Sequence, residues 1–236
     1  MLGRAHAFRA ILKKRTAALP ALLPSAISLL RPVLGLYVLS GAVSTSSTVP
    51  LLIVAVACVS DFVDGRVARA IDRGRAPALG VDEGAAAKHA DRWENYAGRL
   101  VDNLCDFGFL LCMFLFYAGA ELWSPPVWGN LLRHWDGVNR VPVYALLASF
   151  GIYFARLCMD LRAARKPEGS PRGHAAGVAN YGLAILGALE MLPDVDLGPR
   201  LLESAMLGVA LLNAAAVLEN AALMFHRQRG GPTMPA

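Results

Sequence analysis

Residues 49–69 read VPLLIVAVACVSDFVDGRVAR. This stretch is almost entirely apolar as far as Ser60 and then presents Asp61 and Asp64. Because the two aspartates are three positions apart, a helix places them on one face. Ionisable groups at membrane depth are costly and usually functional. The stretch therefore predicts a membrane helix that carries a candidate site at its polar end.

The composition of the whole chain supports a membrane protein. Of its 236 residues, 56% are hydrophobic and 17% are charged, whereas soluble domains average about 45–50% apolar and about 25% charged residues. These values exclude an ordinary soluble domain and a disordered chain. The net charge of +5 would suit nucleic acid, but the apolar excess favours an anionic lipid bilayer as the partner. We expect no nucleic-acid partner.

Six segments qualify as candidate membrane helices, for which about 20 largely apolar residues are needed; they lie at 26–43, 48–60, 103–122, 141–159, 174–192 and 201–225. Lysine and arginine cluster before the first segment and after the second, fourth and last, whereas the connections after the first and fifth hold few or none. Since positive residues mark cytoplasmic loops, this alternation predicts both termini and the candidate site on the cytoplasmic side. We expect an all-α, six-helix transmembrane bundle, in the inner membrane if the protein is bacterial.

The two ends of the chain are predicted to lie outside this bundle. Residues 1–22 mix basic and apolar positions at helical spacing, for example Arg9 and Lys13 against Phe8 and Leu12. This pattern predicts an amphipathic helix on the cytoplasmic membrane surface, with a frayed basic tail as the alternative. We assign residues 23–228 to the six-span domain and residues 229–236 to a flexible tail.

A second pair of aspartates repeats the pattern of the first. Asp102 and Asp106 are four positions apart near the start of the third apolar segment, so two facing helix ends would gather four carboxylates. Such a cluster repels itself unless it is neutralised. Hard divalent cations prefer oxygen ligands, so the cluster predicts one or two Mg²⁺ or Mn²⁺ ions. A purely structural interpretation pairs the acids with the neighbouring arginines Arg66, Arg69 and Arg99.

Small residues beside the acids favour a phosphate ligand. Gly65 and Ala68 are three positions apart and are followed by Arg69, which makes a shallow notch with a cation next to it. Gly98 stands one turn before Asp102. A nucleotide diphosphate would fit this arrangement.

Together the two halves resemble the signature of the CDP-alcohol phosphotransferase family, D-x-x-D-G-x-x-A-R followed by G-x-x-x-D-x-x-x-D. All its fixed positions are present, at Asp61, Asp64, Gly65, Ala68, Arg69, Gly98, Asp102 and Asp106. Residues 24–31, PSAISLLR, are similar to the P-N-x-L-T-x-x-R that often opens these enzymes, with Ser25 and Ser28 in place of the Asn and the Thr.

The resemblance implies a six-span enzyme that transfers a phosphatidyl group from a CDP-linked lipid, commonly CDP-diacylglycerol, to an alcohol and releases CMP. It implies that Asp61, Asp64 and Asp102 hold the metal ions, and that Asp106 shares one of them and acts as general base. It also implies that Gly65, Ala68, Arg69 and Gly98 shape the CDP pocket.

One departure from the family pattern is large. Between Arg69 and Gly98 lie 28 residues, many more than the family motif has there, so we interpret residues 70–97 as a cytoplasmic insertion. Asp82 and Glu83, followed by the alanine-rich stretch 85–90, predict a helix start, so we expect the insertion to extend the third helix into the cytoplasm. The insertion either caps the active site or is an inert elaboration.

The acceptor alcohol is not determined by the sequence. The arginines Arg156, Arg162 and Arg165 lie in and after the fourth segment. They would suit a phosphorylated acceptor such as glycerol 3-phosphate or an inositol phosphate, but the last two also fit ordinary cytoplasmic loop charge. The run from Asp61 to Arg66 is also similar to phosphatidylserine synthases, whose acceptor is serine.

Two other classes share part of the pattern. Membrane prenyltransferases also set paired aspartates around magnesium and a diphosphate, but they usually need more spans and no Gly-x-x-Ala-Arg notch. A transporter would place acids deep in a span as an ion relay, whereas these acids lie at span ends. The small residues of the last segment, Gly208, Ala210 and 214–216, either form a homodimer contact or pack inside the bundle.

Overall fold

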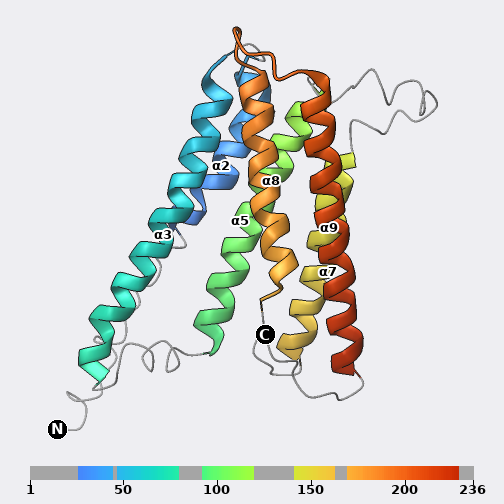
Figure 1. Cartoon of the computed structure of the whole chain (residues 1–236). Coiled ribbons are helices and arrows are strands. Elements are labelled where there is room, and N and C mark those ends of the chain that lie inside the picture. Colours follow the sequence, from blue (N-terminus) through green and yellow to red (C-terminus); the bar gives the residue numbers. More distant parts are fainter. Residues whose placement is uncertain (1–25, 45–46, 80–91, 120–140, 163–168, 229–236) are drawn as a thin grey trace, which may run out of the picture. The chain divides into compact units, whose positions relative to one another are not determined.

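The computed structural model describes residues 26–44, 47–79, 92–119, 141–162 and 169–228, and every regular element in these ranges is helical. The elements along the chain (Figure 1) are α2 (Leu30–Tyr37), the π-helical turn η1 (Val38–Ala42), α3 (Val49–Leu79), α5 (Arg92–Gly119), α7 (Val141–Arg162), α8 (Pro171–Glu190) and α9 (Pro199–Gln228). The expected all-α class is confirmed for this part of the chain. The amphipathic helix expected in residues 1–22 and the tail at 229–236 lie outside the described residues.

Each of the six apolar segments falls largely on a helix, but the helices differ in apolar length. Three stretches are long and apolar enough to cross a membrane, namely Leu100–Gly119, Val141–Arg162 and Arg200–His226, and a shorter apolar helix covers Ala26–Ala42. In α3 the apolar run is cut short by Asp61 and Asp64, and in α8 it is interrupted by Asn180. These helices indicate an integral membrane protein, and the count of six spans stays a prediction.

The chain forms two compact units. The first comprises Met1–Leu34 and Val56–Asp106, and the second comprises Gly35–Ala55 and Phe107–Ala236. The first unit contains every aspartate of the candidate site. The second contains α7, α8 and α9.

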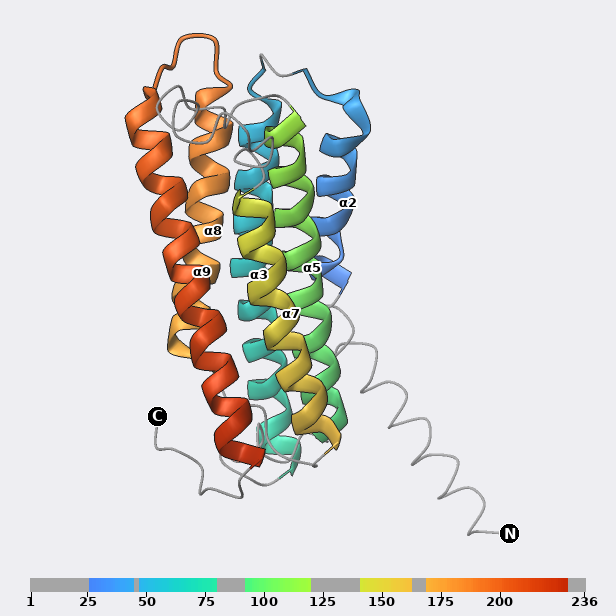
Figure 2. The same cartoon turned by 90° about the vertical axis from the view of Figure 1, so that its right-hand side faces the viewer.

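Within the second unit, α9 packs against both α7 and α8 (Figures 1 and 2). Asn180 of α8 and Asn213 of α9 are both buried and exchange two amide hydrogen bonds, with Nδ2 of Asn213 3.0 Å from Oδ1 of Asn180. At the start of α8, the Ser170 hydroxyl accepts from the Gly173 amide at 2.9 Å and donates to Glu219 of α9. Interhelical polar contacts of this kind hold helices together where the surroundings are apolar.

The two acid-bearing helices both extend past their apolar parts. α3 continues beyond Ser60 for nineteen more residues to Leu79, and α5 begins at Arg92, before Gly98. Residues 70–79 and 92–97 of the predicted insertion therefore belong to these two helices. The helix start predicted at Asp82 lies outside the described residues.

Candidate active site

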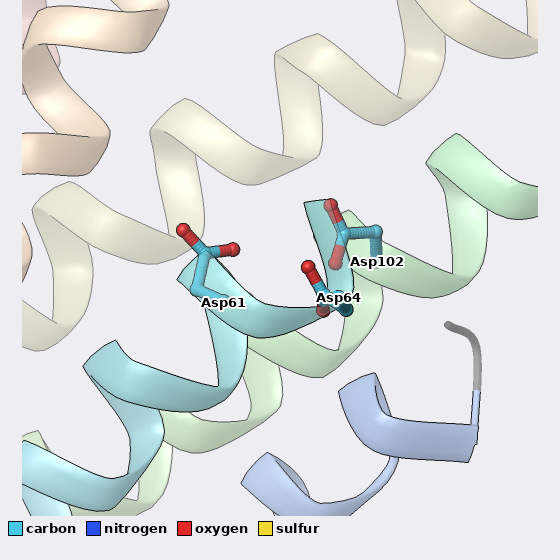
Figure 3. Close-up of side chains that lie close together, drawn as sticks. All are labelled: Asp61, Asp64 and Asp102. Carbon is cyan, nitrogen blue, oxygen red and sulfur yellow. The ribbon is translucent and has the colours of Figure 1, made fainter. Parts of the chain in front are cut away.

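Three aspartates from the two halves of the motif converge on one point. Asp61 and Asp64 come from α3 and Asp102 comes from α5, and each offers one carboxylate oxygen within 4.8 Å of the others. Figure 3 shows the three side chains directed toward one another. The side chain of Asp64 is 9% exposed, whereas those of Asp102 and Asp61 are 44% and 53% exposed. The site is therefore closed on the side of Asp64 and accessible on the side of Asp61.

The guanidinium of Arg31, on α2, lies among these carboxylates. Its side chain is fully buried, and Nη2 lies 3.2 Å from Oδ1 of Asp61 and 3.0 Å from Oδ1 of Asp102. Nη2 also pairs with Asp64, and Nη1 pairs with Asp106. One arginine thus contacts all four aspartates of the motif.

The purely structural interpretation named other arginines as partners of the acids. Of those, Arg66 lies over the ring of Phe62 on its own helix, 4.3 Å from the ring centroid, and the side chains of Arg69 and Arg99 are outside the description. Among the residues that the structure describes, all four acids pair with Arg31 of α2.

Ser28 completes the cluster from the same helical segment as Arg31. Its buried hydroxyl lies 2.7 Å from Oδ2 of Asp64 and 3.1 Å from Oδ1 of Asp102. Since a hydroxyl carries a single proton, it donates to one of the two carboxylates at a time. Sequence reasoning cited Ser28 and Arg31 for the family resemblance but did not name them as site residues. A charged residue inside the apolar segment 26–43 was the available signal, because it needs a partner there.

The remaining motif residues lie on the same two helices. Asp106 is one turn beyond Asp102 on α5 and contacts Nη1 of Arg31. Gly65, Ala68 and Arg69 follow Asp64 on α3, and Gly98 precedes Asp102 on α5. The residues predicted to form the CDP pocket therefore lie within one or two helical turns of the carboxylates on α3 and α5.

The surroundings of Asp61 act on its charge in opposite directions. Asp61 follows the apolar segment 48–60, and partial burial raises the pKa of its carboxyl group. The positive charge of Arg31 lowers this pKa, and the negative charges of Asp102 and Asp64 add to the rise. A divalent cation would favour the ionised form in the same way as Arg31 does.

The donor set fits a hard divalent cation. Three carboxylates from two helices, with Asp106 a turn away, are the kind of oxygen ligands that Mg²⁺ and Mn²⁺ take in proteins. A half-open site also leaves room for waters and substrate phosphates, which Mg²⁺ usually keeps as ligands.

The arginines predicted to bind a phosphorylated acceptor have different surroundings. Arg156 lies on α7 of the second unit and is 2% exposed, with the equally buried Asp160 one turn further on. Its guanidinium lies 5.9 Å from the ring centroid of Tyr153. Arg162 is exposed at the end of α7, and Arg165 lies outside the described residues.

Carboxylates gathered from two helices, with small residues beside them in the sequence, are an arrangement typical of proteins that handle phosphate esters. The family model of the CDP-alcohol phosphatidyltransferases matches residues 21–74, which contain Ser28, Arg31 and the first half of the motif. This match supports the resemblance over those residues, and the matched family consists of transferases of substituted phosphate groups. The second half, from Gly98 to Asp106, lies beyond the matched residues. Comparisons with curated proteins and with solved structures gave no match.

Proposed function

We propose that the protein is a six-span phospholipid synthase. It transfers a phosphatidyl group from a CDP-linked lipid to an alcohol and releases CMP, and CDP-diacylglycerol is the first candidate for the donor. The observation that carries this proposal is the convergence of Asp61 and Asp64 with Asp102. The two halves of the motif meet although 28 residues separate Arg69 from Gly98. Both termini and the site would face the cytoplasm.

The chemistry is a direct displacement at the phosphorus of the lipid phosphate. The hydroxyl oxygen of the acceptor forms the new P–O bond, the bond to the bridging oxygen of the pyrophosphate breaks, and CMP leaves with that electron pair. Two Mg²⁺ or Mn²⁺ ions, held by Asp61, Asp64 and Asp102 and shared by Asp106, would supply charge stabilisation to the attacking and leaving oxygens.

The other motif residues bind the donor and move the proton. Asp106 accepts the proton of the attacking hydroxyl as general base. The small residues Gly65, Ala68 and Gly98 let the cytidine diphosphate approach the helix backbone, and Arg69 contributes a cation for its phosphates. These groups hold donor and acceptor in line, which removes much of the entropic cost of the reaction.

The acceptor stays open among glycerol 3-phosphate, an inositol phosphate and serine. A phosphorylated acceptor would need cations, and we propose Arg156, Arg162 and Arg165 for that role. The support is the burial of Arg156 within an apolar helix, since a charge in such a place is usually functional.

The decisive test is CMP release by the purified protein in lipid nanodiscs containing CDP-diacylglycerol. We expect release that requires both Mg²⁺ or Mn²⁺ and one acceptor from the panel of glycerol 3-phosphate, inositol phosphate and serine. Asp64→Asn should abolish the release, because Asp64 is the most buried of the three converging acids.

Absence of CMP release with every acceptor and metal would reject the proposal. Pyrophosphate release from a prenyl diphosphate would then favour a prenyltransferase. Proton movement into liposomes that contain the protein, measured with a pH-sensitive dye, would favour a transporter.

A further inference from the structure

The position of Arg31 bears directly on how a metal ion could bind. Nη2 lies 3.0 Å from Asp102 and 3.2 Å from Asp61, and it pairs with Asp64 as well. These are the same three residues whose oxygens lie within 4.8 Å of one another. The guanidinium nitrogen therefore stands at the point on which the three carboxylates converge.

A divalent ion bound by all three carboxylates would need that same point. Mg²⁺ binds oxygens at about 2.0–2.1 Å in an octahedron, so neighbouring ligand oxygens lie roughly 3 Å apart. The carboxylates would have to draw together around the ion, and a guanidinium nitrogen between them leaves no room for it. Arginine does not lose its proton in proteins, so it can leave the point only by moving.

Without an ion, the cluster depends on this arginine. The four aspartates and Arg31 have formal charges that sum to −3, and the Arg31 side chain is fully buried. Removing the guanidinium would leave the carboxylates to repel one another in a partly buried place. An incoming ion would bind more readily to carboxylates that are already held close together. In the ion-free protein, however, the group that holds them is the guanidinium of Arg31, which competes with the ion for the same position.

We propose that Arg31 is an internal counter-ion of the metal site: it occupies the convergence point of Asp61, Asp64 and Asp102 in the ion-free protein and must release them before a divalent ion binds to all three. Arg31 is thus a positioning residue that sets the metal affinity of the site. The same movement opens its pair with Asp106, the carboxylate to which the proposed function assigns the acceptor proton. The inference rests on the proposed function for the presence of a metal ion.

The test is a titration of the full chain in nanodiscs with Mn²⁺, without donor or acceptor. Binding is measured as the loss of the electron paramagnetic resonance signal of free Mn²⁺. We expect Arg31→Gln to bind Mn²⁺ on the order of tenfold more tightly than wild type, a typical size for coupling between two competing ligands. Arg31→Lys should lie between the two, because an ammonium keeps the charge but lacks the planar fork that reaches both Asp64 and Asp106. Arg200→Gln, at an exposed position near the start of α9 in the second unit, is the matched control and should leave the Mn²⁺ affinity unchanged.

Equal or weaker Mn²⁺ binding by a folded Arg31→Gln overturns the proposal, as does an absence of Mn²⁺ binding by wild type and both variants. If the glutamine variant does not fold, the lysine variant decides by the same criterion. The CMP assay is read separately. If the Arg31 variants bind Mn²⁺ more tightly but wild type releases no CMP, the transferase is rejected and the counter-ion role is kept. If wild type releases CMP but the variants bind Mn²⁺ with unchanged affinity, the counter-ion role is rejected and the transferase is kept.

Discussion

The hydroxyl of Ser28 is buried between Asp64 and Asp102, at 2.7 and 3.1 Å. Removing a hydrogen-bond donor from a buried carboxylate costs about 1–2 kcal/mol. We therefore expect Ser28→Ala to lower the melting temperature in detergent and to reduce CMP release.

Ser28→Thr is the matched control for this change, because it keeps the hydroxyl and restores the residue that the resembling family motif has there. It should retain both the melting temperature and the rate. Equal loss in the alanine and threonine variants would show that the contact with the acids is not what matters at this position.

Asp106 can be tested separately from the three converging acids. Asp106→Asn keeps an oxygen that can accept from Nη1 of Arg31 but cannot take up a proton from the acceptor alcohol. We expect CMP release to fall to background while the melting temperature stays near that of wild type. Asp196→Asn, at an exposed loop position before α9, should change neither quantity. Turnover close to wild type in Asp106→Asn would remove this residue from the role of base.

The sequence was sufficient to find the aspartates but not their partner. Helix geometry alone puts residues three or four apart on one face, so Asp61 with Asp64 and Asp102 with Asp106 could be paired by spacing. Arg31 precedes Asp106 by 75 positions, and no local rule says which helix end faces the acids. That contact is decided by tertiary packing, which is why the acids were assigned to metal ions or to the nearer arginines.

At the scale of the helices, α5 and α8 pack closely around Tyr117 in the second unit. The Tyr117 hydroxyl of α5 donates to the carbonyl oxygen of Ala184 at 2.7 Å. A Cβ atom added to Gly187 would lie 2.7 Å from the Tyr117 ring, which is too close for the ring to stay in place. We expect Gly187→Ala to destabilise the protein by about 1–3 kcal/mol through overpacking, measured as a lower melting temperature in detergent.

Gly182→Ala on the same helix is the matched control, because an added Cβ there meets no atom within 4 Å. Its melting temperature should equal or exceed that of wild type, since alanine favours helix more than glycine does. A similar loss in both variants would mean that glycine is needed along α8 for some reason other than the contact with Tyr117.

Helix ends were harder to predict than helix positions. The apolar run predicts a membrane span that ends at Ser60, but the helix continues to Leu79. Hydropathy reports where a helix leaves apolar surroundings, whereas backbone hydrogen bonding decides where the helix stops. The residues between Arg69 and Gly98 could therefore be recognised as extra sequence that extends the third apolar helix, whereas the extension of α3 to Leu79 could not be predicted.

At the scale of the whole molecule, the number of spans depends most on α8. It has 20 residues, enough to cross a bilayer core of about 30 Å, yet it contains Arg172, His174 and the buried Asn180. The charge pattern predicts Arg162 on the cytoplasmic side and Asp196 on the opposite side. We expect Arg162→Cys and Asp196→Cys, each in a background without the four native cysteines, to react with a membrane-impermeant maleimide from opposite sides of sealed vesicles.

The buried amide pair explains how α8 could cross the membrane in spite of Asn180. Asn180 has its side chain satisfied by Asn213 of α9, and α9 is one of the helices long and apolar enough to span. A polar group in a bilayer is tolerated when a neighbouring helix supplies its hydrogen bonds, so Asn180 does not prevent α8 from lying beside α9 through the membrane. Labelling of both cysteines from the same side would show that α8 does not cross. The two termini would then lie on opposite sides, because an odd number of spans would remain.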